Sequence, residues 1–127
     1  MSEINVMKMS SQTDLQTAVS RKRRLEQELA RYVQLLIQHH APEKIIVFGS
    51  MAIGNIHPWS DIDLVVIEHT QLPFLRRLHQ VRQLLQPTVG TDILVYTPEE
   101  FEQLCRARPF FSEEIVGKGI VVYERSG

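Results

Sequence analysis

The chain lacks several features that would restrict it to a specialised class of protein. It has a single cysteine, Cys105, in 127 residues, which excludes an intramolecular disulfide and a cysteine-rich zinc site. Its formal net charge is −1, so no overall field steers it toward nucleic acid. It also contains no internal repeat, low-complexity tract or linker. These absences direct attention to local motifs rather than to bulk composition.

Long hydrophobic runs are missing as well. No stretch approaches the ~20 apolar residues of a membrane span, and the first residues lack the apolar core of a signal peptide. We therefore expect a cytoplasmic protein with no membrane contact. Hydrophobic residues make up 43% and charged residues 23% of the chain, as in ordinary soluble globular proteins. One domain over residues 1–127 with one core is expected at this length.

The order of helix-like and strand-like patterns predicts the fold class. Residues 1–12 are polar and expected to be flexible, and a helix is expected over 13–40, with Thr13 at its start. Strands are predicted at about 44–48, 61–67, 92–96 and 120–123, and further helices over 71–86, from Thr97 onward and near 111–116. This order predicts an α+β fold, with a mixed sheet of about four strands and helices packed mainly on one side.

The segment from Gly49 to Asp63, GSMAIGNIHPWSDID, combines a glycine-serine turn with two closely spaced acids. The turn ends a buried strand, and a short helix starting at Ser50 would direct free backbone N–H groups at a phosphate. Asp61 and Asp63 begin the next strand, so alternation places them on one side, roughly 6.5 Å apart. Paired carboxylates of this kind suit Mg2+ or Mn2+. The combination favours a nucleotide and metal site over an ordinary turn beside solvated acids.

This pattern, GS-x10-DxD followed by an apolar strand, resembles the nucleotidyltransferases of the DNA polymerase beta superfamily, specifically the small, minimal nucleotidyltransferase type. The resemblance covers roughly residues 41–96 and continues more loosely to Tyr123. It implies a polymerase-beta-like nucleotidyltransferase fold in which a third carboxylate comes from a later strand. The matching position is Asp92, which follows a Gly-Thr turn and precedes an apolar run.

The resemblance also implies a metal-dependent transfer of a nucleotide from ATP to a hydroxyl, with release of pyrophosphate and with two Mg2+ or Mn2+ ions. The implied catalytic and metal-binding residues are Asp61, Asp63 and Asp92, and the implied nucleotide-binding residues are Gly49 and Ser50. One departure from the family pattern is evident. Many members carry arginines where this chain has Met51 and Ile53, so two charges that help to neutralise a triphosphate are missing.

The acceptor is implied by the size of the chain. Superfamily members that modify nucleic acids or antibiotics usually have further domains, so nucleic acid is not expected as the direct substrate. Minimal members often act beside a small helical HEPN-type protein, as antitoxins that transfer AMP to the toxin. The resemblance thus implies AMP transfer to a protein partner. Two alternatives stay open: a weak or inactive binding module that masks its partner, and a transferase acting on a small molecule.

Three other features have two interpretations each. Trp59 could stack on a base or could plug its loop onto the core. The basic run 21–24, and the arginines at positions 76, 77 and 82, could be solvated helix faces or could attract an acidic partner. The sequence does not decide between these interpretations.

Overall fold

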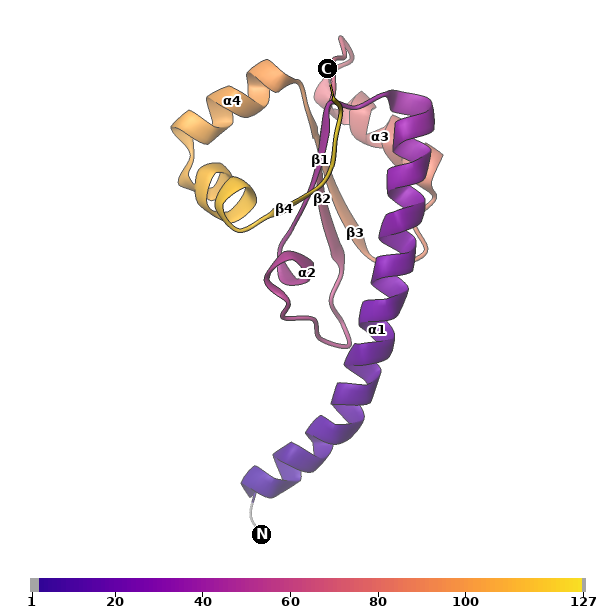
Figure 1. The fold of residues 1–127 in the computed structure, drawn as a ribbon, viewed down its shortest axis with the longest axis vertical. Helices are drawn as coiled ribbons and strands as arrows, with labels where there is room; N and C mark the ends of the chain where they lie inside the picture. The colour runs from indigo at the N-terminus through magenta and orange to yellow at the C-terminus, as the bar shows by residue number, and fades with distance from the viewer. Residues whose placement is uncertain (1–2, 127) are drawn as a thin grey trace.

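A four-stranded sheet with helices around it forms the fold (Figure 1). The structure is a computed structural model that describes residues 3–126, with side chains described from residue 16 onward. In chain order the elements are α1 (Glu3–His40), β1 (Lys44–Phe48), α2 (Ser50–Ile53), β2 (Ile62–Ile67), α3 (Phe74–Leu85), β3 (Thr91–Tyr96), α4 (Pro98–Ala107), the π-helical segment η1 (Phe110–Gly117) and β4 (Ile120–Glu124).

The sheet is mixed, with strand order β3-β2-β1-β4. Strand β1 runs antiparallel to both β2 and β4, whereas β2 and β3 are parallel. The predicted α+β fold with a mixed four-stranded sheet is therefore confirmed. Because β2 and β3 are parallel neighbours, residues that begin the two strands lie at the same end of the sheet. That end carries the acids singled out in the sequence.

Helices cover both faces of the sheet, rather than mainly one as the sequence predicts. The larger apolar cluster lies under α1 and α3 and includes Leu25, Tyr32, Leu36, Val81 and Leu85. A smaller cluster on the other face joins Phe111 and Ile115 of η1 to Ile46 and Val65, with α4 beside it. The central strands are apolar on both faces, so each face needs a cover. Figure 1 shows the two layers on opposite sides of the strands.

Helix α1 begins earlier than the sequence suggests. The predicted start at Thr13 is wrong, because α1 spans Glu3–His40, and the flexibility expected of residues 1–12 stays a prediction. No glycine or proline occurs among residues 3–12 to interrupt the helix. At 1.5 Å per residue such a helix is ~57 Å long, and its first turns extend beyond the end of the sheet (Figure 1). Neither α1 nor any other described helix is long and apolar enough to cross a membrane.

Buried polar contacts fix α1 to the segment that precedes β3. The Glu28 carboxylate accepts hydrogen bonds from the Thr88 backbone N–H at 2.8 Å and the Thr88 hydroxyl at 2.7 Å. The Arg31 guanidinium also donates to Glu28, and this bond is the main reason that the pKa of Glu28 falls to about 2. One turn further on, the Tyr32 and Thr91 hydroxyls are 2.8 Å apart in a buried hydrogen bond. Helix α1 is therefore part of the framework around the start of β3.

Strand β3 forms one edge of the sheet, and arginines from α3 cover part of it. Arg82 donates to the Thr91 carbonyl, and Arg77 Nη1 donates to the Val95 carbonyl at 3.2 Å. Arg77 is buried and also pairs with Glu100, with Nη1 2.6 Å from Oε1. These two edge carbonyls already have donors, which hinders the addition of another strand. The interpretation of Arg77 as part of a solvated basic face is therefore wrong, whereas Arg82 is exposed and also contacts the edge of β3.

Candidate functional site

The site is built around two aspartates on neighbouring strands. In the parallel register of β2 and β3, Asp63 is directly paired with Asp92. Adjacent strands lie about 4.8 Å apart, and paired residues project from the same face of a sheet. Both carboxylates therefore stand on the face that Val65 and Leu94 share with the smaller cluster. The sequence-predicted proximity of Asp63 and Asp92 is present in the structure.

The surroundings of the Asp63 carboxyl disfavour its charged form. Partial burial is the largest cause that raises the pKa of Asp63 to about 6, and the negative charge of Asp92, a hydrogen bond with that carboxyl and the charge of Asp61 add to it. Like charges at this distance disfavour double ionisation. A divalent cation between the carboxylates would relieve this repulsion.

Gly49 is required on two grounds, its backbone conformation and its contact with Asp63. Its φ of 73° and ψ of −151° lie in a region that side chains rarely adopt. A Cβ atom at this position would lie only 2.3 Å from Asp63 Oδ2. The Asp63 carboxylate lies in the space that a side chain at position 49 would need. Helix α2 begins at Ser50, as predicted, so the turn and the acid are in direct contact.

Asp61 lies just before β2 and is held from two sides. A Cβ atom on Gly90 would lie 2.4 Å from Asp61 Oδ1, so the carboxylate rests against that glycine. Across the site, Arg21 Nη2 of α1 lies 3.5 Å from Asp61 Oδ1, and Arg21 Nε donates to the Ser60 carbonyl at 2.8 Å. The guanidinium therefore fixes the backbone at Ser60 and attracts the Asp61 side chain toward α1.

The carboxylate oxygens of Asp61, Asp63 and Asp92 are suitable ligands for a divalent cation, but the three side chains do not converge on one point. Among residues 16–126, no three His, Cys, Asp or Glu side chains form a group that could hold a metal ion. Asp63 and Asp92 come together, whereas Asp61 is directed at Arg21. All three offer hard oxygen ligands, which Mg2+ and Mn2+ prefer. Asp63 and Asp92 would hold such an ion, and Asp61 would have to turn from Arg21 to join them.

Sequence reasoning missed two residues of the site, Gly90 and Arg21. From the sequence, Gly90 indicates only the end of a turn. Its position two residues before Asp92 could have indicated room for the Asp61 side chain, had Asp61 been expected close to the start of β3. The contact of Arg21 with Asp61 joins residues far apart in the sequence, so no local pattern reports it. Its neighbour Arg24 is similarly engaged, donating to the Thr88 carbonyl at 2.9 Å. These two arginines are therefore not simply a solvated face.

The loop between the turn and the acids is held by Ser60. Its buried hydroxyl accepts from the His57 backbone N–H at 2.7 Å. Trp59 is 72% exposed and stacks on the His57 ring, with centroids 4.9 Å apart. The interpretation of Trp59 as a plug onto the core is therefore wrong, and its indole is available at the surface.

Met51 and Ile53, at the positions where many family members have arginine, form an apolar surface. Met51 and Ile53 line a groove of about 500 Å³ between α2 and α1, opposite Val19 and Lys22. The Ile53 side chain is 57% exposed. Helix α2 therefore contributes no positive charge beside the Gly49-Ser50 turn.

Residues 31–127 match the family described as polymerase beta, nucleotidyltransferase. The match covers most of the chain, and the protein belongs to this family. No curated protein matches the sequence.

Two solved structures share the fold. A candidate nucleotidyltransferase from Sulfolobus solfataricus superposes with a TM-score of 0.65 at 17% identity, covering 86% of this chain and 88% of that one. A chain from a toxin–antitoxin structure with AMP-PNP superposes with a TM-score of 0.54 at 22% identity, covering 76% of this chain and 73% of that one. At these identities the likeness establishes the fold.

Proposed function

We propose that the protein transfers AMP from ATP to a hydroxyl of a protein partner, as the antitoxin of a HEPN-type toxin–antitoxin pair. The pairing of Asp63 with Asp92, directly beside Gly49, is the observation that carries this proposal. Membership of the nucleotidyltransferase family supports the type of reaction. The shared fold of a toxin–antitoxin chain with AMP-PNP supports a protein partner and an adenine nucleotide.

In the proposed complex, the outer phosphates of ATP lie at Gly49 and Ser50. The first backbone N–H groups of a helix lack partners within the helix and suit an anion. The Ser50 hydroxyl adds a donor. Helix α2 has only four residues, so these direct donors matter more than its dipole.

The acceptor oxygen attacks the α-phosphorus in line with the leaving group. A new O–P bond forms while the bond to the bridging oxygen breaks, and pyrophosphate leaves with the electron pair. Asp92 is exposed and receives the hydroxyl proton. When bound at Asp61, Asp63 and Asp92, Mg2+ or Mn2+ ions neutralise charge on the attacking and leaving oxygens.

The test uses purified protein, ATP, Mg2+ and a purified HEPN-type protein as the partner. Intact mass of the partner should increase by one AMP with the wild type and should not change with Asp92→Asn. Binding of the partner should survive this substitution, because it removes one charge and leaves the fold in place. A partner that is neutralised equally by both proteins, without a mass change, would sink the transferase proposal.

A masking module is the second candidate, and the apolar groove at Met51 and Ile53 is the observation that favours it. In that case the groove contacts the partner, and catalysis is dispensable. Ile53→Arg separates the two candidates. A masking protein should lose partner affinity, whereas a transferase should keep its partner and bind MgATP at least as tightly.

A further inference from the structure

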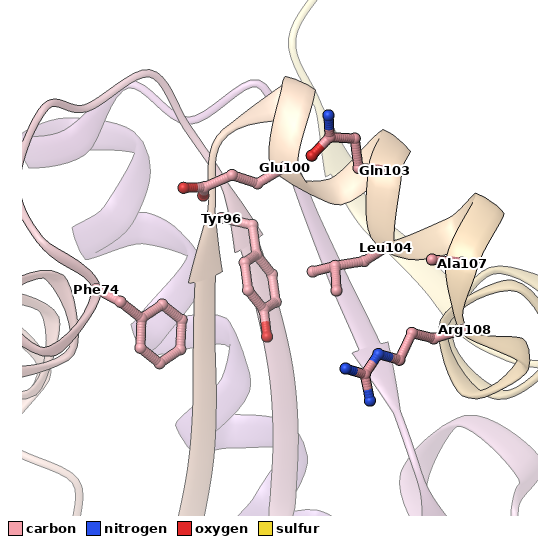
Figure 2. A pocket seen from close by; sticks show the side chains of 7 residues that line it. All are labelled: Phe74, Tyr96, Glu100, Gln103, Leu104, Ala107 and Arg108. Carbon is pink, nitrogen blue, oxygen red and sulfur yellow. The ribbon is translucent and has the colours of Figure 1, made fainter.

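The sheet face that carries Asp92 continues into a cavity between β3 and α4. The cavity measures about 430 Å³, and Tyr96 at the end of β3 forms one wall (Figure 2). Asp92, Leu94 and Tyr96 alternate along β3 and therefore share a face. The start of the cavity wall is four residues from Asp92, or roughly 13 Å along the strand.

The aromatic wall of this cavity is held in place by neighbouring rings. Tyr96 stacks on Phe74 with centroids 5.4 Å apart and an interplanar angle of 29°. The buried Phe111 meets the same ring edge to face at 5.7 Å. Leu104 and Ala107 of α4 complete the apolar lining (Figure 2). Such a preorganised wall binds a ligand without first having to be ordered.

The cavity has a positive charge that no group among residues 16–126 balances. Glu100 is already engaged by Arg77, with Nη1–Oε1 at 2.6 Å and Nη2–Oε2 at 3.1 Å. Arg108 is exposed, and within residues 16–126 its guanidinium has no hydrogen-bond or ion-pair partner. Figure 2 shows this guanidinium turned toward the cavity. A planar guanidinium beside an aromatic wall favours a carboxylate joined to an apolar group.

The geometry of in-line attack indicates the side from which the acceptor protein approaches, and hence which molecule reaches the cavity. The leaving pyrophosphate lies at Gly49 and Ser50, which follow β1, and β2 separates β1 from β3. In-line attack brings the acceptor from the side opposite the leaving group. That side is β3, where Asp92 is exposed and where the cavity opens. A segment that carries the acceptor hydroxyl therefore reaches the cavity without crossing the nucleotide.

We infer that this cavity is a subsite for an acidic segment of the acceptor protein, an assignment that rests on the proposed function. An aromatic or aliphatic side chain of the segment lies against Tyr96 and Leu104. An aspartate or glutamate carboxylate next to it binds Arg108. The two contacts position a hydroxyl of the same segment at Asp92. The volume is within the usual range of ligand pockets, ~300–1,000 Å³.

Peptide binding tests the subsite without any nucleotide. The probe is a fluorescently labelled peptide with one tyrosine and one phenylalanine flanked by glutamates, and its control has lysines in place of the glutamates. Fluorescence anisotropy should show that Arg108→Gln weakens binding of the glutamate peptide roughly tenfold, the loss of one charge-assisted hydrogen bond. Ala107→Phe, which fills the cavity, should weaken it to a similar extent. The lysine peptide should bind poorly to every variant.

Arg106→Gln is the matched control, because Arg106 is on the same helix but pairs with Glu102. It should leave binding unchanged. The subsite is refuted if the wild type does not prefer the glutamate peptide, if the three variants behave alike, or if Arg108→Gln weakens MgATP binding instead. AMP transfer to the peptide is measured separately by mass. Selective peptide binding without any transfer would remove the proposed function and keep an acidic-peptide site in the cavity.

Discussion

At the scale of single residues, Asp63 has the most constrained environment in the site. Its carboxylate fills the space that a side chain on Gly49 would need, and Asp92 faces it across the strand pair. Partial burial and these charges disfavour its ionised form. The protein thus keeps an arrangement that is electrostatically unfavourable without a cation, as expected of residues retained for binding rather than for stability.

Asp63→Asn should stabilise the protein in the absence of metal. The pKa of Asp63 in the folded state is about 6, above its value of 3.8 in an unfolded chain. The folded state therefore binds more protons between these values, so stability falls as pH rises from about 4 to about 6. At pH 7 the variant should gain on the order of 1 kcal/mol in denaturant unfolding, allowing for partial solvation.

The pH series provides the check on this prediction. In metal-free buffer the wild type should lose stability as pH rises from about 4 to about 6, and Mg2+ should restore this stability. The stability of Asp63→Asn should depend only weakly on pH and on Mg2+. Glu99→Gln, a change at an exposed acid, is the control and should follow the wild type. A variant less stable than the wild type at pH 7 would show that Asp63 has a structural role.

Gly49→Ala and Gly54→Ala form a matched pair. Both glycines have positive φ, 73° and 74°, but a Cβ on Gly54 meets nothing within 4 Å. Gly54→Ala should therefore lower the free energy of unfolding by about 1 kcal/mol, which is the cost of placing alanine in a positive-φ conformation. Gly49→Ala should cost more, because Asp63 must also move, and should weaken Mg2+ and MgATP binding measured by calorimetry. Equal losses of stability and unchanged Mg2+ binding would show that the Gly49–Asp63 contact is unimportant.

At the scale of elements, the long helix α1 acts as a support for the site. Its side chains reach two segments that surround the acids: Arg21 contacts Ser60 and Asp61, and residues 24, 28 and 32 contact Thr88 or Thr91. The strands place the carboxylates, and α1 fixes the loops that precede those strands.

Arg21→Ala should lower the rate of the proposed transfer more than it weakens ATP binding. Arg21 holds the Ser60 carbonyl and the Asp61 carboxylate, so its loss misplaces a metal ligand while Gly49 and Ser50 stay in position. A decrease of about tenfold in kcat with a small change in KM is expected, the effect of one or two hydrogen bonds. Arg21→Lys should restore part of the rate.

Arg23→Ala is the control for this measurement, since Arg23 is exposed on the same helix. It should behave as the wild type does. A similar decrease in kcat and a similar change in KM in both arginine variants would indicate a general charge effect. An unchanged kcat in Arg21→Ala would exclude a positioning role for Arg21.

The elements were predictable from sequence to the extent that they depend on local patterns. The apolar runs of β1 and β2, and the Thr97-Pro98 start of α4 with its capping box to Glu100, are where the sequence places them. The start of α1 was missed because a polar stretch without breakers has no local stop signal. The contacts of Arg21 and Gly90 with Asp61 were missed because they depend on tertiary packing between distant segments.

At the scale of the whole molecule, the helical layers on both faces leave only the two edges of the sheet for backbone pairing. The β3 edge is partly covered by Arg77 and Arg82. The β4 edge is different: its strand pairs only with β1, and Ile120 and Val121 are 47% and 48% exposed. The two edges of one sheet thus differ in their readiness to accept a further strand.

This asymmetry sets a limit on assembly. Two copies joined strand to strand through β4 would form a continuous sheet with a partly covered β3 edge at each end. No third copy could then be added in the same way, so such pairing stops at two. Growth into a fibre would first require Arg77 and Arg82 of α3 to leave the β3 carbonyls. Assembly by strand pairing is therefore limited to a dimer.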